Sequence, residues 1–360
     1  MDRQPLAMQG RLIEALKMTA PGTQLRQSID NIVRARTGAL LVFADEEKIR
    51  PMISGGIDID VALRPMILYE LAKMDGAILL DPSGKHISHA NVQLMPDSSI
   101  DSQETGTRHR TAERVAKQLD ALAISISASR DVVTIYVGDV RYIMDPIRVI
   151  LSKADQALQT LERFRSRLNL VMDSLSTLEF QQAVTLFDVT TVLQRVEMVL
   201  ALSHLIERYI IELGTEGRLV QLQLEELLFN VREDRTAVLA DYLPDPTPEH
   251  LTEAEQALGA LPSDELLSAG SVVRILGYGP DVEALELHLH PRGYRMLRKI
   301  PRLSRYAIEN VMAQFGTLQG IMNAPVEDLA AIDGVGVARA HDIKEGLIRL
   351  RELDRVERYG

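Results

Sequence analysis

The 360-residue sequence contains no cysteine and no tryptophan. Without cysteine, disulfide bonds, thiolate zinc sites and cysteine nucleophiles are all excluded. Aromatic residues make up only 4% of the chain, whereas 46% of residues are hydrophobic and 25% are charged, which is typical of globular proteins. No uninterrupted apolar run approaches the roughly 18 residues of a membrane span, and charges interrupt the N-terminal segment, so no signal peptide is expected. These absences predict a soluble, cytoplasmic protein with no membrane association.

The net charge of −11 is unevenly distributed along the chain. A uniformly acidic surface would repel the phosphates of nucleic acid. However, residues 291–360 contain twelve Lys and Arg against nine Asp and Glu, a net charge of +3, so the first 290 residues carry −14. The basic residues of this tail are densest between positions 292 and 305. A solvated surface would explain such a cluster, and contact with phosphates is the alternative.

Strand and helix patterns are mixed in residues 1–145. Short β-branched runs bounded by turn residues predict strands at 39–43, 76–80, 124–127 and 132–137. Amphipathic stretches predict helices at 25–36, 61–73 and 111–119, and turn residues at 81–84 and 138–139 predict hairpins. We therefore expect a mixed-sheet α/β domain with some antiparallel pairing.

Beyond residue 146 the strand patterns disappear. Apolar residues between Ala154 and Leu178 recur at alternating spacings of three and four, a heptad pattern, and a second seam runs from Val189 to Ile210. These seams predict a long helical hairpin, for which a stiff spacer is the simplest role. Alternating prolines at 244–248 predict a linker. The expected class is α+β, with an α/β domain in 1–145, an all-α spine in 146–290 and a small all-α domain in 291–360.

The segment Gly106-Thr107-Arg108-His109-Arg110-Thr111 has the chemistry of an anion site. Thr107 or Thr111 can begin a helix, whose free N–H groups and dipole favour an anion. The two arginines add bidentate phosphate donors, so a triphosphate would fit. A basic turn paired with surface acids would explain the same residues. Asp75-Gly76 opens a predicted strand, where a carboxylate could hold Mg²⁺, although this dipeptide is also a common turn.

Together, Asp75-Gly76-Ala77 and Arg108-His109-Arg110 resemble the signature pair of the bacterial diadenylate cyclases, and residues 90–94 are similar to the pattern between them. The resemblance implies an ATP pocket with Leu94 against the adenine and Arg108 and Arg110 on phosphates. It implies Asp75 as metal ligand or base, with Mg²⁺ or Mn²⁺ as cofactor. The full set of implied ATP contacts is Gly76, Leu94, Thr107, Arg108, His109, Arg110, Thr111, Ser127 and Arg130.

The implied reaction condenses two ATP molecules into cyclic di-AMP and releases two pyrophosphates. The 3′-hydroxyl of one ATP attacks the α-phosphorus of the other, and catalysis rests mainly on positioning and charge neutralisation. Because a single pocket holds one ATP, two pockets must face each other, which requires at least a homodimer. The family resemblance further implies an octamer.

The tail contains a pattern similar to a helix-hairpin-helix. Glycines in Ile332-Asp333-Gly334-Val335-Gly336 would let the backbone approach a phosphate, and Ile300-Pro301-Arg302-Leu303-Ser304 is a degenerate copy 32 residues earlier. A tandem pair would bind branched DNA without reading its sequence. A protein–protein module of the same shape is the alternative. The predicted DNA contacts are Arg298, Lys299, Arg302, Arg305, Gly334, Val335, Gly336 and Arg339.

Three functions remain open from the sequence. The first is a diadenylate cyclase coupled to binding of branched or damaged DNA in a DNA-integrity checkpoint. The second is an ATP-sensing, DNA-binding scaffold of recombination or repair without turnover. The third is a nucleotidyltransferase that uses another acceptor.

Overall fold

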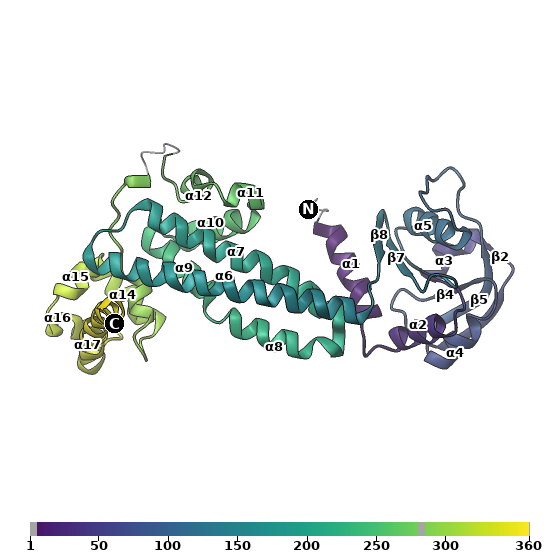
Figure 1. The fold of residues 1–360 in the computed structure, drawn as a ribbon, viewed down its shortest axis with the longest axis horizontal. Helices are drawn as coiled ribbons and strands as arrows, with labels where there is room; N and C mark the ends of the chain where they lie inside the picture. Colours follow the sequence, from purple (N-terminus) through teal and green to yellow (C-terminus); the bar gives the residue numbers. More distant parts are fainter. Residues whose placement is uncertain (1–5, 280–284, 360) are drawn as a thin grey trace. The chain divides into compact units, whose positions relative to one another are not determined.

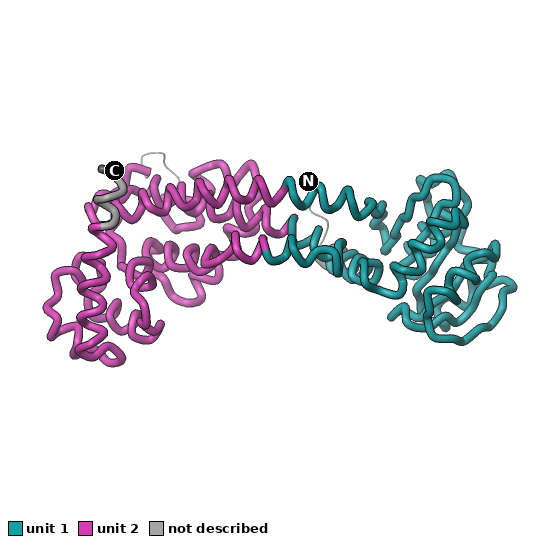
Figure 2. Tube along the Cα trace, turned by 60° about the horizontal axis from the view of Figure 1, so that its bottom comes forward, with its two compact units in different colours: residues 1–156, 206–222 teal, residues 157–205, 223–360 magenta. Residues whose placement is uncertain are grey.

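A computed structural model describes residues 6–279 and 285–359 (Figure 1). The chain forms two compact units, which Figure 2 shows in different colours. Unit 1 comprises residues 1–156 and 206–222, and unit 2 comprises residues 157–205 and 223–360.

Unit 1 is built on a mixed β-sheet. Within the described residues the strand order is β2-β5-β4-β1-β6-β7-β8, and β3 also pairs with β5. Strands β1 and β4 are parallel, and the remaining pairs are antiparallel. The strands are β1 (Ala39–Phe43), β2 (Ile53–Ser54), β3 (Ile57–Ala62), β4 (Ala77–Leu80), β5 (His86–Leu94), β6 (Leu122–Ile126), β7 (Val133–Val137) and β8 (Val140–Ile143).

Helices cover both faces of this sheet. One face carries α1 (Leu6–Thr19), α2 (Gln24–Arg34) and α4 (Pro65–Leu71), and the other carries α3 (Glu46–Ile49), the 3₁₀ turn η1 (Arg50–Met52) and α5 (Thr107–Leu119). Successive residues of β1 alternate between the two cores, with Leu41 in the first and Val42 in the second. A strand buried on both faces is apolar throughout, which explains its clear pattern in the sequence. The predicted mixed α/β fold is confirmed.

One predicted helix is wrong in its first part. The expected helix at 61–73 is divided between β3, which ends at Ala62, and α4, which begins at Pro65. Proline suits the first turn of a helix, because it lacks the N–H that an interior position must donate. The residues before Pro65 are therefore free to continue the strand, where Val61 pairs with Ile87.

The rest of the described chain is almost entirely helical. The predicted heptad seams lie in α6 (Ile147–Gln181) and α7 (Leu186–Leu213). Pro244 and Pro246 lie between α9 (Val231–Tyr242) and α10, whereas Pro248 is the first residue of α10. The helices are α6 (Ile147–Gln181), α7 (Leu186–Leu213), η2 (Gly214–Gly217), α8 (Arg218–Leu227), α9 (Val231–Tyr242), α10 (Pro248–Ala260), α11 (Ser263–Leu266), α12 (Ala269–Ile275), α13 (Tyr294–Arg298), α14 (Arg305–Phe315), α15 (Leu318–Asn323), α16 (Val326–Ala330) and α17 (Gly336–Tyr359).

A single helical stretch, Leu186–Tyr242, is long and apolar enough to cross a membrane, among the residues that the structure describes. Its most apolar window has a mean hydropathy of 1.3, and 56% of that window is buried inside the protein. Burial of this kind is typical of a core helix, so the stretch is weak evidence for a membrane span.

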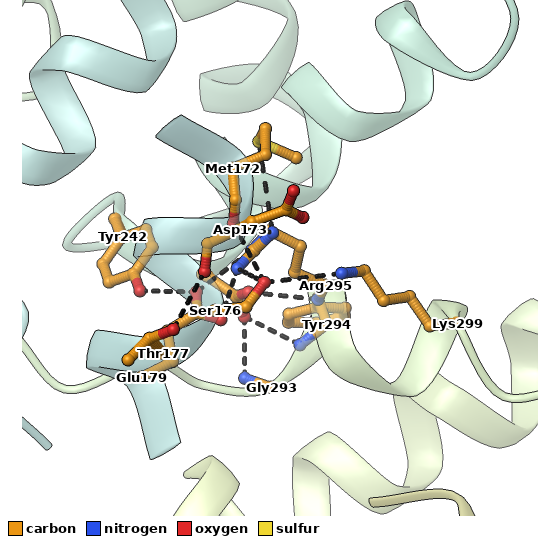
Figure 3. Close-up of polar contacts among 11 residues, drawn as sticks. Met172, Asp173, Ser176, Thr177, Glu179, Tyr242, Gly293, Tyr294, Arg295 and Lys299 are labelled. Carbon is orange, nitrogen blue, oxygen red and sulfur yellow. Dashed lines mark hydrogen bonds and ion pairs between the residues drawn. The ribbon is translucent and has the colours of Figure 1, made fainter. Parts of the chain in front are cut away.

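A buried ion-pair network joins α13 to α6 and α9 within unit 2 (Figure 3). The Arg295 side chain is 1% exposed and donates to both carboxylate oxygens of Glu179, at 3.1 Å from Nε and 2.7 Å from Nη2. The Tyr242 hydroxyl donates to the same carboxylate at 2.7 Å, and Ser176 Oγ accepts from Arg295 Nη2 at 2.9 Å. Each of these four side chains therefore has at least one hydrogen-bond partner within the network.

Asp241 attaches the start of α13 to the same network. Its Oδ1 accepts the backbone N–H groups of Gly293 and Tyr294, both at 2.7 Å, and its Oδ2 accepts that of Arg295 at 3.0 Å. Burial and the nearby Glu179 carboxylate raise the pKa of Asp241 to about 7, although the three backbone donors act in the opposite direction. The start of α13 is therefore fixed at both its backbone and its Arg295 side chain.

Candidate active site

A cavity of about 580 Å³ lies at the N-terminal ends of the parallel strands β1 and β4. The end of β5, the first turn of α5 and residues 54–56 also line it. Six of the ten residues predicted for the nucleotide site line it. They are Asp75, Gly76, Leu94, Thr107, Arg108 and Thr111. Residues 33 positions apart in the sequence are thus brought to one pocket by the β4-β5-α5 connection.

Gly76 is required by the close approach of β5. An ideal Cβ at this position would lie 2.3 Å from the carbonyl carbon of Asn91 and 2.5 Å from its Cα. Asn91 has a left-handed φ of 53°, and the β4–β5 register shifts between Ala77 and Leu79. The wall of the pocket therefore contains a bulge that presses on the glycine.

Replacing Gly76 with Ala is expected to lower the free energy of unfolding of unit 1 by about 1–3 kcal/mol, since backbone must move to admit the methyl group. Urea denaturation measures this loss. Gly10→Ala is the matched control, because a Cβ there meets no atom within 4 Å and the position is helical. Equal stability of the two variants would show that the backbone at Asn91 moves aside without loss of stability.

The first turn of α5 presents unpaired donors to the cavity. Gly106 is the N-cap, and no side chain caps this end of the helix. The N–H groups of the first turn consequently have no intrahelical acceptor, and the helix dipole adds partial positive charge. The prediction that Thr107 can start the helix is confirmed.

Arg108 and Asp75 form an ion pair across the cavity mouth. Arg108 Nη2 donates to Asp75 Oδ1 at 2.7 Å. The Asp75 side chain is 97% exposed and that of Arg108 is 36% exposed. An exposed pair of this kind contributes little to stability, so a strong phosphate ligand can take the guanidinium from the carboxylate.

Four predicted nucleotide residues lie outside the cavity wall. Arg110 is exposed and donates from Nε to the Glu104 carbonyl at 3.3 Å, while Ser127 follows β6 and donates its N–H to Val132 at 2.9 Å. Arg130 is exposed on the β6–β7 connection. None of the three side chains forms part of this pocket as the structure describes it.

His109, the fourth of these residues, is half-buried beside the cavity. Burial lowers its pKa, as do the charges of Arg141, Arg130 and Arg108, whereas the Glu104 carboxylate raises it. The imidazole is therefore neutral at pH 7, and the positive charge near the pocket comes from the arginines.

Sequence reasoning missed the part of the cavity wall formed by residues 54–56. Ser54 ends β2, Gly55 and Gly56 connect it to β3, and all three line the pocket. Asn91 and Gln93 of β5 also line it, within the segment 90–94 that is similar to the family pattern. The Gly-Gly pair was the available signal, since it permits close backbone approach. Nothing in the local sequence indicated that this turn would line the same cavity as Arg108.

The two predicted hairpins of the tail are short turns between helices in unit 2. Residues 299–304 connect α13 to α14, and residues 331–335 connect α16 to α17. Arg302 has a φ of 63° and Gly334, its counterpart 32 residues later, has a φ of 82°. The Tyr306 hydroxyl donates to Asp333 Oδ2 at 2.6 Å, which brings the second turn against α14.

The predicted DNA contacts differ in their availability. Arg302, Arg305, Gly336 and Arg339 are exposed, although Arg305 pairs with Glu309 and Arg339 donates to the Gly334 carbonyl. Val335 is only 4% exposed and its N–H donates to Ile332, so it packs the core of the module and offers no side-chain contact.

The two basic residues at the end of α13 and the start of the first turn are held by other parts of unit 2. Arg298 donates to the Glu233 carbonyl at 2.8 Å, and Lys299 Nζ lies 3.4 Å from Ser176 Oγ (Figure 3). Desolvation and the charge of Arg295 lower the pKa of Lys299. Both would have to leave these partners to bind a phosphate.

Proteins named DNA integrity scanning protein DisA match almost the whole chain. The protein of Carboxydothermus hydrogenoformans is 49% identical over 345 residues, which cover 95% of this chain and 97% of its own. Those of Acetivibrio thermocellus and Clostridium tetani are 48% and 46% identical, and cover 95% and 96% of this chain and 94% and 96% of their own. The chain belongs to the DNA integrity scanning protein family. The resemblance to bacterial diadenylate cyclases is confirmed, and the protein is an enzyme of that class.

Two family models match successive parts of this chain. Residues 26–140 match the DisA bacterial checkpoint controller nucleotide-binding region, and residues 144–285 match the DisA bacterial checkpoint controller linker region. The cavity lies within the first of these spans. Its position thus agrees with a nucleotide-binding role.

The cavity wall offers a carboxylate, which suits a metal ion whose remaining ligands come from the substrate. No group of three or more His, Asp or Glu side chains suited to a metal occurs in the described part of the chain. Mg²⁺ is commonly held by one or two carboxylates together with substrate phosphates. Asp75, the carboxylate that lines this cavity, could supply that share once a triphosphate is bound.

Proposed function

We propose that the protein condenses two ATP molecules into cyclic di-AMP with release of two pyrophosphates. The observation that carries this proposal is the convergence of Asp75, Arg108 and the uncapped N-terminus of α5 on one cavity. At about 580 Å³, the cavity has the size of a typical small-molecule site.

The residues of the cavity suggest how one ATP is held. The first turn of α5 would donate N–H groups to the triphosphate, and Arg108 would neutralise it as a bidentate ligand. Leu94, at the end of β5, would provide an apolar contact for the adenine. Asp75 would then be free to bind Mg²⁺ or Mn²⁺, which would supply charge neutralisation, or to accept the proton of the 3′-hydroxyl.

The chemistry requires a second chain. Each ATP supplies both the attacking 3′-hydroxyl and the attacked α-phosphorus, so two cavities must face each other across an isologous interface. A homo-oligomer is therefore part of the proposal, with the octamer as the proposed size. We also propose a cytoplasmic location and a division at residues 1–145, 146–290 and 291–360.

The direct test is to incubate the purified protein with ATP and Mg²⁺ or Mn²⁺ and separate the products by chromatography. Cyclic di-AMP and pyrophosphate are expected in a ratio of one to two. Absence of both from folded, oligomeric protein would contradict the proposal.

We further propose that the tandem hairpin module binds branched DNA and that this binding alters cyclase output. Support comes from the net charge of +3 in residues 291–360 and from the two adjacent turns. Cyclase output should change when a four-way junction saturates the protein. Unchanged cyclase output with the junction bound would show that DNA binding is not coupled to cyclase activity.

Arg302→Gly is expected to weaken junction binding about 3- to 10-fold at low salt, because one phosphate contact is lost. Glycine suits the left-handed backbone at this position, so the variant should fold at least as stably as the parent. Fluorescence anisotropy over a salt series measures the affinity, with a slope about one unit shallower for the variant. Unchanged affinity and slope would remove Arg302 from the DNA interface.

A further inference from the structure

The connection between β5 and α5 is long and is fixed at both ends. Residues 95–106 form neither helix nor strand, yet they lead directly into the first turn of α5. Their first half is held by α5 itself, since Arg114 donates to the Ile100 carbonyl at 2.9 Å and Lys117 to the Asp101 carbonyl at 3.0 Å. Glu113 of α5 also accepts the Ser102 hydroxyl at 2.5 Å and the backbone N–H of Gln103. The helix therefore holds the connection as far as residue 103, which leaves residues 104 and 105 to be fixed by other means.

Glu104 fixes the last part of the connection to the sheet. Its Oε1 accepts the Tyr136 hydroxyl at 2.8 Å and Arg141 Nε at 2.5 Å. Tyr136 and Arg141 lie directly opposite each other on β7 and β8, so a cross-strand pair presents two donors to one oxygen. The Glu104 side chain is 15% exposed, which protects the interaction from solvent screening.

The anchor is rigid because Tyr136 belongs to the core beneath α5. The residue is 1% exposed and packs in the same cluster as Ala112, Val115 and Ala116 of that helix. Hydrogen bonds from Tyr136 and Arg141 lower the pKa of Glu104 against the effect of desolvation, so the carboxylate is ionised at neutral pH. The backbone carbonyl of Glu104 also accepts Arg110 Nε.

We infer that Glu104 is a positioning residue of the nucleotide site, which fixes the first turn of α5 so that its N–H groups and Arg108 meet the triphosphate. This inference rests on the proposed function. Glu104 lies two residues before the N-cap Gly106 and four before Arg108. Loss of the anchor would let the connection adopt several positions, so only a fraction of molecules would hold the triphosphate-binding geometry. The apparent affinity for ATP is then the intrinsic affinity multiplied by that fraction.

Three variants test the anchor in the full-length protein. Glu104→Ala removes the acceptor, Glu104→Gln keeps an oxygen for Tyr136 but loses the charge, and Arg141→Met removes one donor.

Glu104→Ala is expected to raise the KM for ATP about 10-fold while kcat changes less than about 3-fold. Glu104→Gln should recover part of the loss. Glu104→Gln combined with Arg141→Met should be little worse than either alone, because both remove the same charged contact.

Hydrogen exchange distinguishes positioning from general stabilisation. Faster amide exchange in Glu104→Ala should be confined to residues 103–110, with the remainder of unit 1 unchanged. Glu70→Gln, which removes the exposed ion pair between Glu70 of α4 and Lys73, is the matched control and should alter neither KM nor this exchange. Faster exchange throughout unit 1 would make Glu104 an ordinary stabilising residue and overturn the inference.

The outcome is separable from that of the proposed function. If the parent protein forms no cyclic di-AMP, the proposed function fails, and calorimetric ATP affinity then tests the anchor. A 10-fold loss of that affinity in Glu104→Ala would support the inference, and parental affinity would contradict it. If the parent protein forms product and Glu104→Ala has the parental KM, only the inference is wrong.

Discussion

Replacing Asp75 with Asn is expected to lower cyclic di-AMP formation by about 10³-fold or more, while ATP affinity stays within about 3-fold of the parent. The amide is nearly isosteric, but it carries no charge for a metal and accepts no proton. Loss of the ion pair leaves Arg108 free for phosphate, so binding is preserved. Product chromatography measures turnover, and isothermal titration measures affinity.

Asp45→Asn serves as the control for this prediction. Asp45 pairs with Lys48 on the same unit, is 53% exposed and lies outside the proposed site, so its loss should leave turnover unchanged. Turnover retained in Asp75→Asn would exclude the proposed role of that carboxylate. If the unsubstituted protein binds ATP but forms no product, the ATP-sensing scaffold is favoured.

A nucleotide analogue distinguishes the cyclase from a nucleotidyltransferase that uses another acceptor. With 3′-deoxy-ATP as the only nucleotide, self-condensation lacks its attacking hydroxyl and should stop. A nucleotidyltransferase with another acceptor would still release pyrophosphate when that acceptor is present. The pyrophosphate assay therefore distinguishes the two enzymes without any change to the protein.

Replacing Arg295 with Met is expected to lower the free energy of unfolding of unit 2 by about 3–5 kcal/mol, because it leaves the buried Glu179 carboxylate without its ionic partner. Tyr242 and Ser176 also lose part of a shared network. Urea denaturation with hydrogen exchange across residues 293–298 measures the loss, which should be largest where α13 meets Asp241.

Two further variants show whether the loss comes from an unpaired buried charge. Arg295→Met combined with Glu179→Gln should be more stable than Arg295→Met alone, because no buried charge then lacks a partner. Arg305→Met removes a surface pair with Glu309 and should cost less than about 1 kcal/mol. Equal losses in Arg295→Met and Arg305→Met would show that the network contributes only as surface pairs do.

Strands buried on both faces were predictable, whereas the bulged strand β5 was not. The strand predicted at 39–43 is β1, and that predicted at 132–137 differs from β7 by one residue. Strand β5 contains His86, His89 and Asn91 and is interrupted by a bulge, so its periodicity is lost from the sequence. Pairing with β3 and β4 stabilises it instead, and a local pattern carries no information about such partners.

The candidate site shows the same limit. Glycine, arginine and threonine at the start of α5 have a local chemical meaning, and they were found. Glu104 had no such meaning, because its role depends on Tyr136 and Arg141, more than thirty residues later in the chain. In the degenerate copy Arg302 stands where the second hairpin has Gly334, and both residues have a left-handed φ.

The ion pair between Asp75 and Arg108 makes the Asp75 carboxylate a competitor of any anionic ligand for the Arg108 guanidinium. An incoming triphosphate must displace a carboxylate that is covalently part of the same chain, which lowers the affinity of weakly charged ligands most. Under the proposed reaction, the product carries less charge per nucleotide than ATP does. Re-formation of the pair would therefore expel cyclic di-AMP more readily than substrate, so an exposed contact of little value to stability would favour release of the product.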